Sequence, residues 1–140
     1  MILPLRYARS WRVLSAMLLL AVLVATMMPA VWFWPDRAQL VGLITNVDKW
    51  AHFVAFTVLC VWFTGLYERR AFWRIGIGLL AFGVLIEVCQ RLVGYRSAEW
   101  FDIAADGAGI IAGFVIASAG AAGWGLRVEQ WYSRRFANDD

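Results

Sequence analysis

The sequence predicts an all-α protein, a four-helix transmembrane bundle with short connecting loops and cytoplasmic termini. Hydrophobic residues make up 62% of the 140 residues and charged residues only 16%, whereas an ordinary globular domain is about 45–50% apolar. Four apolar runs are long enough to cross a bilayer, which takes about 20 residues per helix. The net charge of +3 accompanies no nucleic-acid motif, so the basic linkers are better explained by orientation in the membrane and by membrane lipid.

The four spanning segments are expected to form a single membrane domain over residues 1–140. The apolar runs predict helices over about 13–31, 50–66, 72–93 and 102–122. The first run follows Arg6, Arg9 and Arg12 as in a signal peptide, but small residues are missing at a plausible cleavage site, so an uncleaved anchor is expected. The linkers after the second and third helices are short, which makes consecutive helices antiparallel neighbours.

The distribution of Lys and Arg predicts the orientation of the bundle, because cytoplasmic linkers carry an excess of these residues. Nine of the basic residues fall on one side of the alternating helices, namely Arg6, Arg9, Arg12, Arg69, Arg70, Arg74, Arg127, Arg134 and Arg135. Four fall on the other side, namely Arg37, Lys49, Arg91 and Arg96. We therefore expect both termini in the cytoplasm and the linkers over 35–47 and 94–101 outside.

Polar side chains lie within the apolar runs, at the ends that this orientation places outside. Ionisable groups are costly in a bilayer and usually face the bundle interior or a wet cavity. Asp48 and His52 are four residues apart at the start of the second helix and share a face. Helix capping explains the position of Asp48, and anchoring to lipid headgroups explains that of Lys49. His52 lies about one turn deeper than Asp48, where neither capping nor anchoring explains a polar residue well.

Glu87 lies inside the third helix, about six residues before its outer end. A carboxylate at that depth needs a partner, and Gln90 and Arg91 follow near the same face. Two interpretations stay open. In one, Glu87 forms an internal pair with Arg91 that fixes helix packing; in the other, Glu87 faces a ligand.

The fourth helix carries Asp102 and Asp106, four residues apart, on a face that continues as Gly109-x3-Gly113. Small residues at this spacing let helices approach closely. The face that packs tightly therefore points both carboxylates into the bundle. In the outer linker, Arg96 either bridges to a carboxylate or clamps a substrate phosphate or carboxylate.

An ordered set of motifs joins these residues, namely Asp48-Lys49-x-x-His52-Phe53-x-x-Phe56, Glu87-x-x-Gln90, Arg96-Ser97 and Asp102-x3-Asp106-x2-Gly109-x3-Gly113. This set, over about 48–113, resembles the VanZ-like family of bacterial integral membrane proteins. The resemblance implies a multi-pass protein of the bacterial cytoplasmic (inner) membrane with a polar cluster at its outer end, and it supplies no established reaction. Asp106 departs from the family's usual Asn, and an extra acid changes the charge of the cluster.

The first functional hypothesis is a membrane enzyme or binding protein that acts on an amphiphilic cell-envelope molecule, lipid-linked or glycopeptide-related, at the outer leaflet. The candidate catalytic acid–base residues are His52 as the base, Asp48 as the group that orients it, and Glu87 or Asp106 as the second acid. The candidate substrate-binding residues are Lys49, Gln90, Arg96 and Asp102. With a single histidine and no metal-binding spacing, the sequence predicts no metal and no cofactor.

The alternative hypothesis is a structural or interaction protein of the envelope. Its polar cluster would only lock helix packing or dock a membrane protein partner. A proton-coupled carrier is a third possibility, which four helices without a visible inverted repeat disfavour. Whether a reaction is catalysed stays open between these hypotheses.

Overall fold

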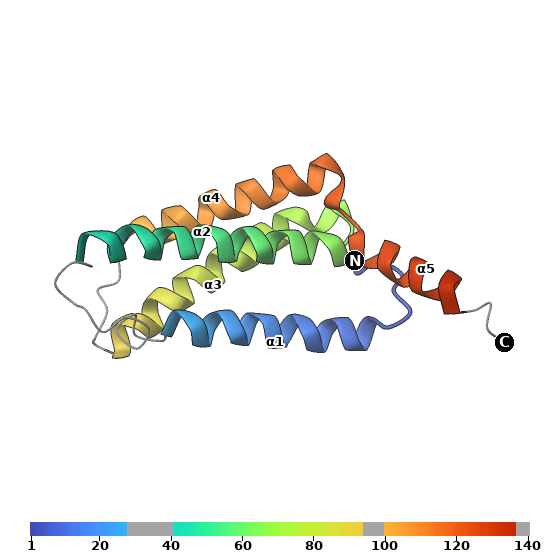
Figure 1. Ribbon diagram of the computed structural model, residues 1–140, viewed down its shortest axis with the longest axis horizontal. Helices are drawn as coiled ribbons and strands as arrows, with labels where there is room; N and C mark the ends of the chain where they lie inside the picture. The colour runs from blue at the N-terminus through green and yellow to red at the C-terminus, as the bar shows by residue number, and fades with distance from the viewer. Residues whose placement is uncertain (28–40, 94–99, 137–140) are drawn as a thin grey trace.

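Helices dominate the computed structural model (Figure 1). It describes residues 1–27, 41–93 and 100–136, and the side chains of residues 1–27, 49–92 and 100–135. Within these ranges the one strand-like pairing is an isolated bridge between Ile2 and Tyr67. The helices are α1 (Ala8–Met27), α2 (Val41–Leu66), α3 (Phe72–Val93), α4 (Trp100–Ile116) and α5 (Trp124–Phe136), with short helical turns η2 (Arg69–Ala71) and η3 (Ala117–Ala121).

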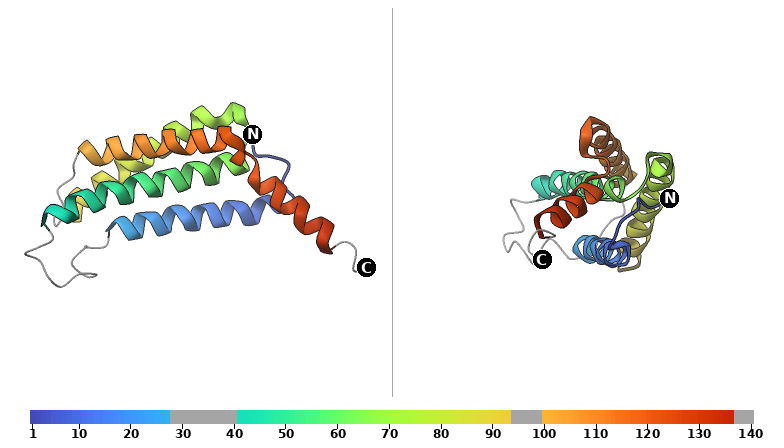
Figure 2. Two further views of the ribbon diagram at one scale, coloured as in Figure 1. Left: turned by 45° about the horizontal axis from the view of Figure 1, so that its top comes forward. Right: turned by 90° about the vertical axis from the view of Figure 1, so that its right-hand side faces the viewer.

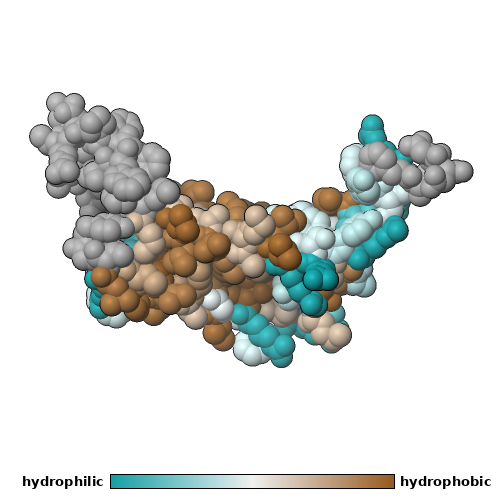
Figure 3. All heavy atoms as spheres, turned by 90° about the horizontal axis from the view of Figure 1, so that it is seen from below, coloured by the Kyte–Doolittle hydropathy of each residue, from teal (hydrophilic) through white to brown (hydrophobic). Residues whose placement is uncertain are grey.

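Four helical segments of the described chain are long and apolar enough to cross a membrane, which confirms the predicted all-α transmembrane fold. Large apolar side chains on their outer faces are exposed, among them Met17, Ile77 and Ile111. Figure 3 shows the resulting apolar surface along the middle of one face, with hydrophilic residues gathered toward the α5 end. Such a surface fits contact with lipid chains. Which end faces the cytoplasm stays a prediction.

Two helices begin earlier than the spans expected from the apolar runs. α1 begins at Ala8 rather than near Val13, and α2 begins at Val41 rather than near Trp50. A helical backbone continues through polar flanks, whereas an apolar run marks only the part that can lie in hydrocarbon. The last residues of the first expected span, 28–31, lie outside the described residues.

The fourth helical segment ends in a break and is followed by a fifth helix. α4 reaches Ile116 and η3 continues to Ala121, near the expected end at about Ala122; Gly120 within η3 has a φ of 125°, and Gly123 just after it has a φ of 71°. These left-handed conformations favour glycine and end a helix. The Arg127 guanidinium donates to the carbonyls of Gly120 (2.9 Å) and Ala122 (2.8 Å) at this helix end. Hydropathy alone does not reveal such an interruption.

α2 lies at the centre of the bundle, with α4 alongside it (Figures 1 and 2). A Cβ on Gly109 would lie 3.1 Å from the Phe56 Cβ and still closer to the Phe53 carbonyl oxygen. A Cβ on Gly113 would lie 3.0 Å from the Thr57 carbonyl oxygen. The Thr57 hydroxyl donates to the Phe53 carbonyl at 2.7 Å and lies 3.2 Å from the Gly109 carbonyl. The small-residue face of α4 thus packs on the α2 backbone, as its spacing predicts.

Glu129 on α5 binds the residues at the start of α1. Its buried carboxylate accepts hydrogen bonds from the backbone N–H groups of Arg6 (2.7 Å) and Tyr7 (3.0 Å) and from the Trp11 indole (2.8 Å). A helix N-terminus favours negative charge, and α1 begins directly after Tyr7. The Trp11 ring also meets the Trp124 ring edge to face, with centroids 5.4 Å apart. α5 is thereby tied to the start of α1.

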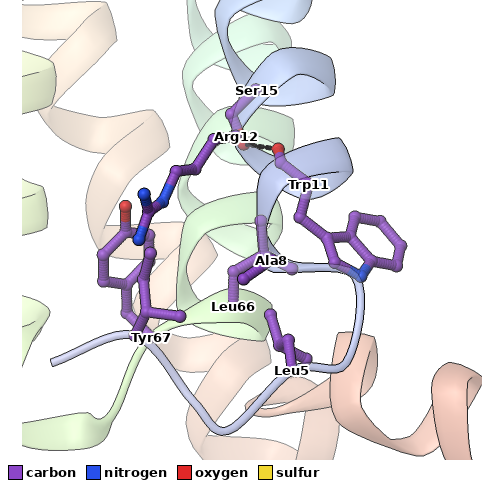
Figure 4. Close-up of a pocket in the computed structure, with 8 residues that line it drawn as sticks. Leu5, Ala8, Trp11, Arg12, Ser15, Leu66 and Tyr67 are labelled. Carbon is purple, nitrogen blue, oxygen red and sulfur yellow. Dashed lines mark hydrogen bonds between the residues drawn. The ribbon is translucent and has the colours of Figure 1, made fainter.

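The N-terminal residues cross the same end of the bundle, where the Leu3 N–H donates to the Leu66 carbonyl at 3.0 Å. Figure 4 shows the small cavity beside this contact, with the Ser15 hydroxyl bonded to the Trp11 carbonyl. Its volume is about 10 Å³, which at most admits one water molecule. This cavity is therefore too small for an organic ligand.

Replacing Glu129 with Ala should lower the free energy of unfolding by about 2–4 kcal/mol, because three donors lose a charged acceptor. Thermal unfolding in detergent, followed by tryptophan fluorescence, measures this loss. The control is Glu68→Ala, which removes an ion pair with the exposed Arg70 and should cost at most about 1 kcal/mol. Equal losses in the two variants would contradict the structural role of Glu129.

Candidate functional site

Five buried polar residues lie on the three helices α2, α3 and α4. They are His52 on α2, Glu87 and Gln90 on α3, and Asp102 and Asp106 on α4, each with an exposed fraction of 4% or less. One ring nitrogen of His52 and one carboxylate oxygen each of Glu87 and Asp102 lie within 4.8 Å of one another. His52, Glu87, Asp102 and Asp106 thus form one cluster, which we call the polar cluster.

The central contact of the polar cluster joins His52 to Asp106, with Nδ1 and Oδ1 2.9 Å apart. An ionised carboxylate only accepts hydrogen bonds, so beside ionised Asp106 the Nδ1 atom carries the proton and Nε2 is left to accept one. The His52 ring also stacks on the Phe56 ring, with centroids 6.4 Å apart and planes at 5°. These two contacts fix both the position and the orientation of the imidazole.

Asp106 therefore occupies the position of the orienting carboxylate that was predicted for Asp48. Asp48 shares a helix with His52, and its four-residue spacing suggested the orienting contact. The structure shows that α4 supplies an orienting carboxylate instead. The side chain of Asp48 lies outside the described ones, so its own predicted role stays a prediction.

Gly83 on α3 makes room for the Asp106 carboxylate. A Cβ built on Gly83 would collide with the Asp106 Oδ2 atom and lie 3.3 Å from the Phe56 ring. Gly83 was not predicted from the sequence as a residue of the site. Its position four residues before Glu87, on the same helix face, is the signal that could have revealed it.

The α3 side of the cluster is anchored to α1 through Gln90, whose Nε2 atom donates to the Thr26 carbonyl at 3.1 Å. Gln90 was expected to bind substrate, and this contact gives it a structural bond between helices. Arg91, which was expected near the same face, is exposed, whereas Glu87 is buried. The interpretation of Glu87 and Arg91 as an internal buried pair therefore receives no support.

The two remaining predicted site residues are the cationic residues Lys49 and Arg96. Lys49 is half-buried in α2, with its Nζ atom 5.9 Å from the centroid of the Phe101 ring on α4. This is a cation–π geometry between α2 and α4, although Lys49 lies eight residues after the start of α2 and not at the helix end expected for a headgroup anchor. Arg96 lies outside the described residues, and its predicted clamp on a phosphate or carboxylate stays a prediction.

A groove of about 620 Å³ lies elsewhere, along α3, with Leu19 of α1 in its wall. Its lining is largely apolar, with Phe63, Phe82 and Leu85, and it includes Arg74. Neither the four residues of the polar cluster nor Gln90 line it. The outer-leaflet pocket expected at the polar cluster thus remains a prediction.

The chemistry available in the polar cluster is that of an imidazole beside carboxylates in a region shielded from water. The Nε2 atom of His52 can take or give a proton once Asp106 holds Nδ1. Glu87 and Asp102 supply oxygen atoms that can accept hydrogen bonds or bind a cation. Three different helices supply these groups, so their spacing depends on the packing of the whole bundle.

The fold and the polar cluster define a multi-pass α-helical membrane protein with buried acid–base residues supplied by three helices. The family model of VanZ/LLP1 matches residues 1–121. The chain therefore belongs to the VanZ/LLP1 family, as the motif resemblance predicted, and the match extends beyond the range 48–113 on which that resemblance was based. Comparisons with curated proteins and with solved structures found no match.

Replacing Gly83 with Ala should destabilise the protein by about 1–3 kcal/mol, the usual cost of overpacking a close contact. The added methyl group must displace the Asp106 carboxylate and weaken its bond to His52. Thermal unfolding in detergent measures the change in the free energy of unfolding.

Gly78→Ala is the matched control on the same helix, because a Cβ there meets no atom within 4 Å. This change should leave stability unchanged or raise it by up to about 1 kcal/mol through helix propensity. If Gly83→Ala proves as harmless as Gly78→Ala, Asp106 does not pack against α3 as described.

Proposed function

We propose that this protein binds an amphiphilic cell-envelope molecule, such as a lipid-linked cell-wall or polysaccharide precursor, at the polar cluster. The observation that carries the proposal is the convergence of His52, Glu87 and Asp102 from three helices, all buried. Ionisable residues inside a membrane are costly and commonly mark a path or site for a substrate or ion. A polar headgroup would meet these residues while its chains lie among the apolar helix faces.

The proposed roles follow from the contacts within the cluster. His52 is the general base, Asp106 orients its ring, and Glu87 or Asp102 is the second acid. General acid–base chemistry requires a positioned proton acceptor within reach of the reacting group. Lys49 and Arg96 complete the proposal as cationic groups for an anionic headgroup.

We further propose that the polar cluster lies in the outer half of the bacterial cytoplasmic membrane, with both termini in the cytoplasm. The support is the charge distribution, since basic residues concentrate in cytoplasmic flanks. α5 carries Arg127, Arg134 and Arg135, and it lies at the end of the bundle opposite to the starts of α2 and α4 (Figure 1).

The second candidate function is structural, and two bonds favour it. The contact of His52 with Asp106 joins α2 to α4, and the bond from Gln90 to Thr26 joins α3 to α1. Polar bonds between helices stabilise membrane bundles by about 0.6–2 kcal/mol each. In this case the cluster would hold the helices together, for the bundle itself or for docking a membrane protein partner.

His52→Ala and Glu87→Gln separate these two functions. If the cluster binds a headgroup, both variants should reach the membrane at wild-type abundance and lose affinity for a polyprenyl phosphate at least tenfold, about 1.4 kcal/mol. Native mass spectrometry of the protein in lipid nanodiscs measures the binding, with phosphatidylglycerol as the competing bulk anionic lipid.

Glu129→Gln is the control for this experiment, because it alters a buried carboxylate at the other end of the bundle. It should leave binding of the polyprenyl phosphate unchanged. Loss of abundance in His52→Ala and Glu87→Gln, with unchanged affinity in the protein that remains, would support the structural function instead.

Cysteine labelling tests the proposed orientation. Ser97→Cys in intact cells should react with a membrane-impermeant maleimide, whereas Ser133→Cys on α5 should react only after the cells are opened. The wild-type protein serves as the background control, because Cys60 and Cys89 both lie within apolar spans. Protection of Ser97→Cys combined with labelling of Ser133→Cys would reverse the topology.

A further inference from the structure

We propose that His52, Glu87 and Asp102 form a binding site for a divalent transition-metal cation such as Mn²⁺ or Zn²⁺. The proposal rests on the proposed function and deepens it, because such a cation would contact an anionic headgroup in the same cluster. No metal was predicted from the sequence, since the spacing of these residues along the chain matches no metal motif. Only the packing of three helices brings them together.

The donor atoms have a suitable chemical identity and separation. An imidazole nitrogen and two carboxylate oxygens lie within 4.8 Å of one another. Ligands at about 2.0–2.2 Å from a tetrahedral Zn²⁺ lie roughly 3.4 Å apart, so small side-chain movements close the remaining difference. A mixed nitrogen and oxygen set suits Mn²⁺ and Zn²⁺ better than Ca²⁺, which prefers six to eight oxygen ligands.

Asp106 supplies a second, independent observation. Histidine ligands usually donate their other ring N–H to a carboxylate, which fixes the ring and strengthens it as a ligand. Asp106 Oδ1 stands 2.9 Å from His52 Nδ1, in the place of that carboxylate, so Nε2 is the proposed metal ligand. The other oxygen of Asp106, Oδ2, is buried against Gly83 and has no hydrogen-bond partner in the part of the chain that the structure describes.

Burial strengthens the inference, because His52, Glu87 and Asp102 are each at most 4% exposed. Glu129, by comparison, is a buried carboxylate whose two oxygens accept hydrogen bonds from N–H groups. Its surroundings are those of a structural anchor, and it stands with no second acid or histidine among its bonded partners. It therefore serves as the matched control for metal binding.

The test uses the purified full-length protein, stripped with a chelator and titrated with Mn²⁺ or Zn²⁺ alone. Electron paramagnetic resonance for Mn²⁺ and calorimetry for Zn²⁺ should show one site per chain. Asp102→Asn and His52→Ala should weaken binding at least tenfold. Asp106→Ala should weaken it by about 10- to 100-fold as a supporting residue, and Glu129→Gln should not change it.

The absence of stoichiometric binding to the wild-type protein would overturn the proposal, even if some variants fail to fold. Equal binding by wild type, Asp102→Asn and His52→Ala would overturn it as well. Polyprenyl phosphate binding is measured on the same samples. Lipid binding without metal binding rejects the cation site and leaves the proposed function standing, whereas metal binding without lipid binding supports the cation site and counts against the proposed function.

Discussion

The close approach of α2 and α4 is the constraint on which the polar cluster depends. Gly109 and Gly113 carry no side chain where α4 meets the α2 backbone, and the Thr57 hydroxyl lies between the helices. Asp106 stands one turn from Gly109, so the depth of this contact sets its distance from His52. In lipid, apolar surfaces gain little by meeting each other, and such small-residue contacts decide how helices associate.

α1, in contrast to α2 and α4, is held by polar bonds and not by close packing. It carries a single buried residue, Ser15, and it is fastened near both ends by polar bonds. Glu129 binds its start and Gln90 donates to the Thr26 carbonyl near its end. Between these attachments α1 exposes apolar side chains suited to lipid. The bundle thus combines a close-packed pair, α2 and α4, with a helix held largely by its termini.

Much of the fold could be predicted from the sequence, because long apolar runs permit only helices in a membrane. The inward direction of His52, Glu87 and Asp106 was also predictable, since charged groups avoid lipid. The choice of Asp106 as the carboxylate on His52 was not, because helical spacing reveals neighbours along one helix only. The structural role of Glu129 was not predictable for a related reason, since its partners at the start of α1 lie far away in the sequence.

A double-mutant cycle between His52 and Asp106 tests the central claim, that a contact between α2 and α4 organises the cluster. Unfolding free energies of wild type, His52→Ala, Asp106→Ala and the double variant give the coupling energy. A direct buried contact predicts a coupling of about 0.5–3 kcal/mol, with the double variant less destabilised than the sum of the single ones. Additive effects within about 0.3 kcal/mol would show that the two side chains do not interact.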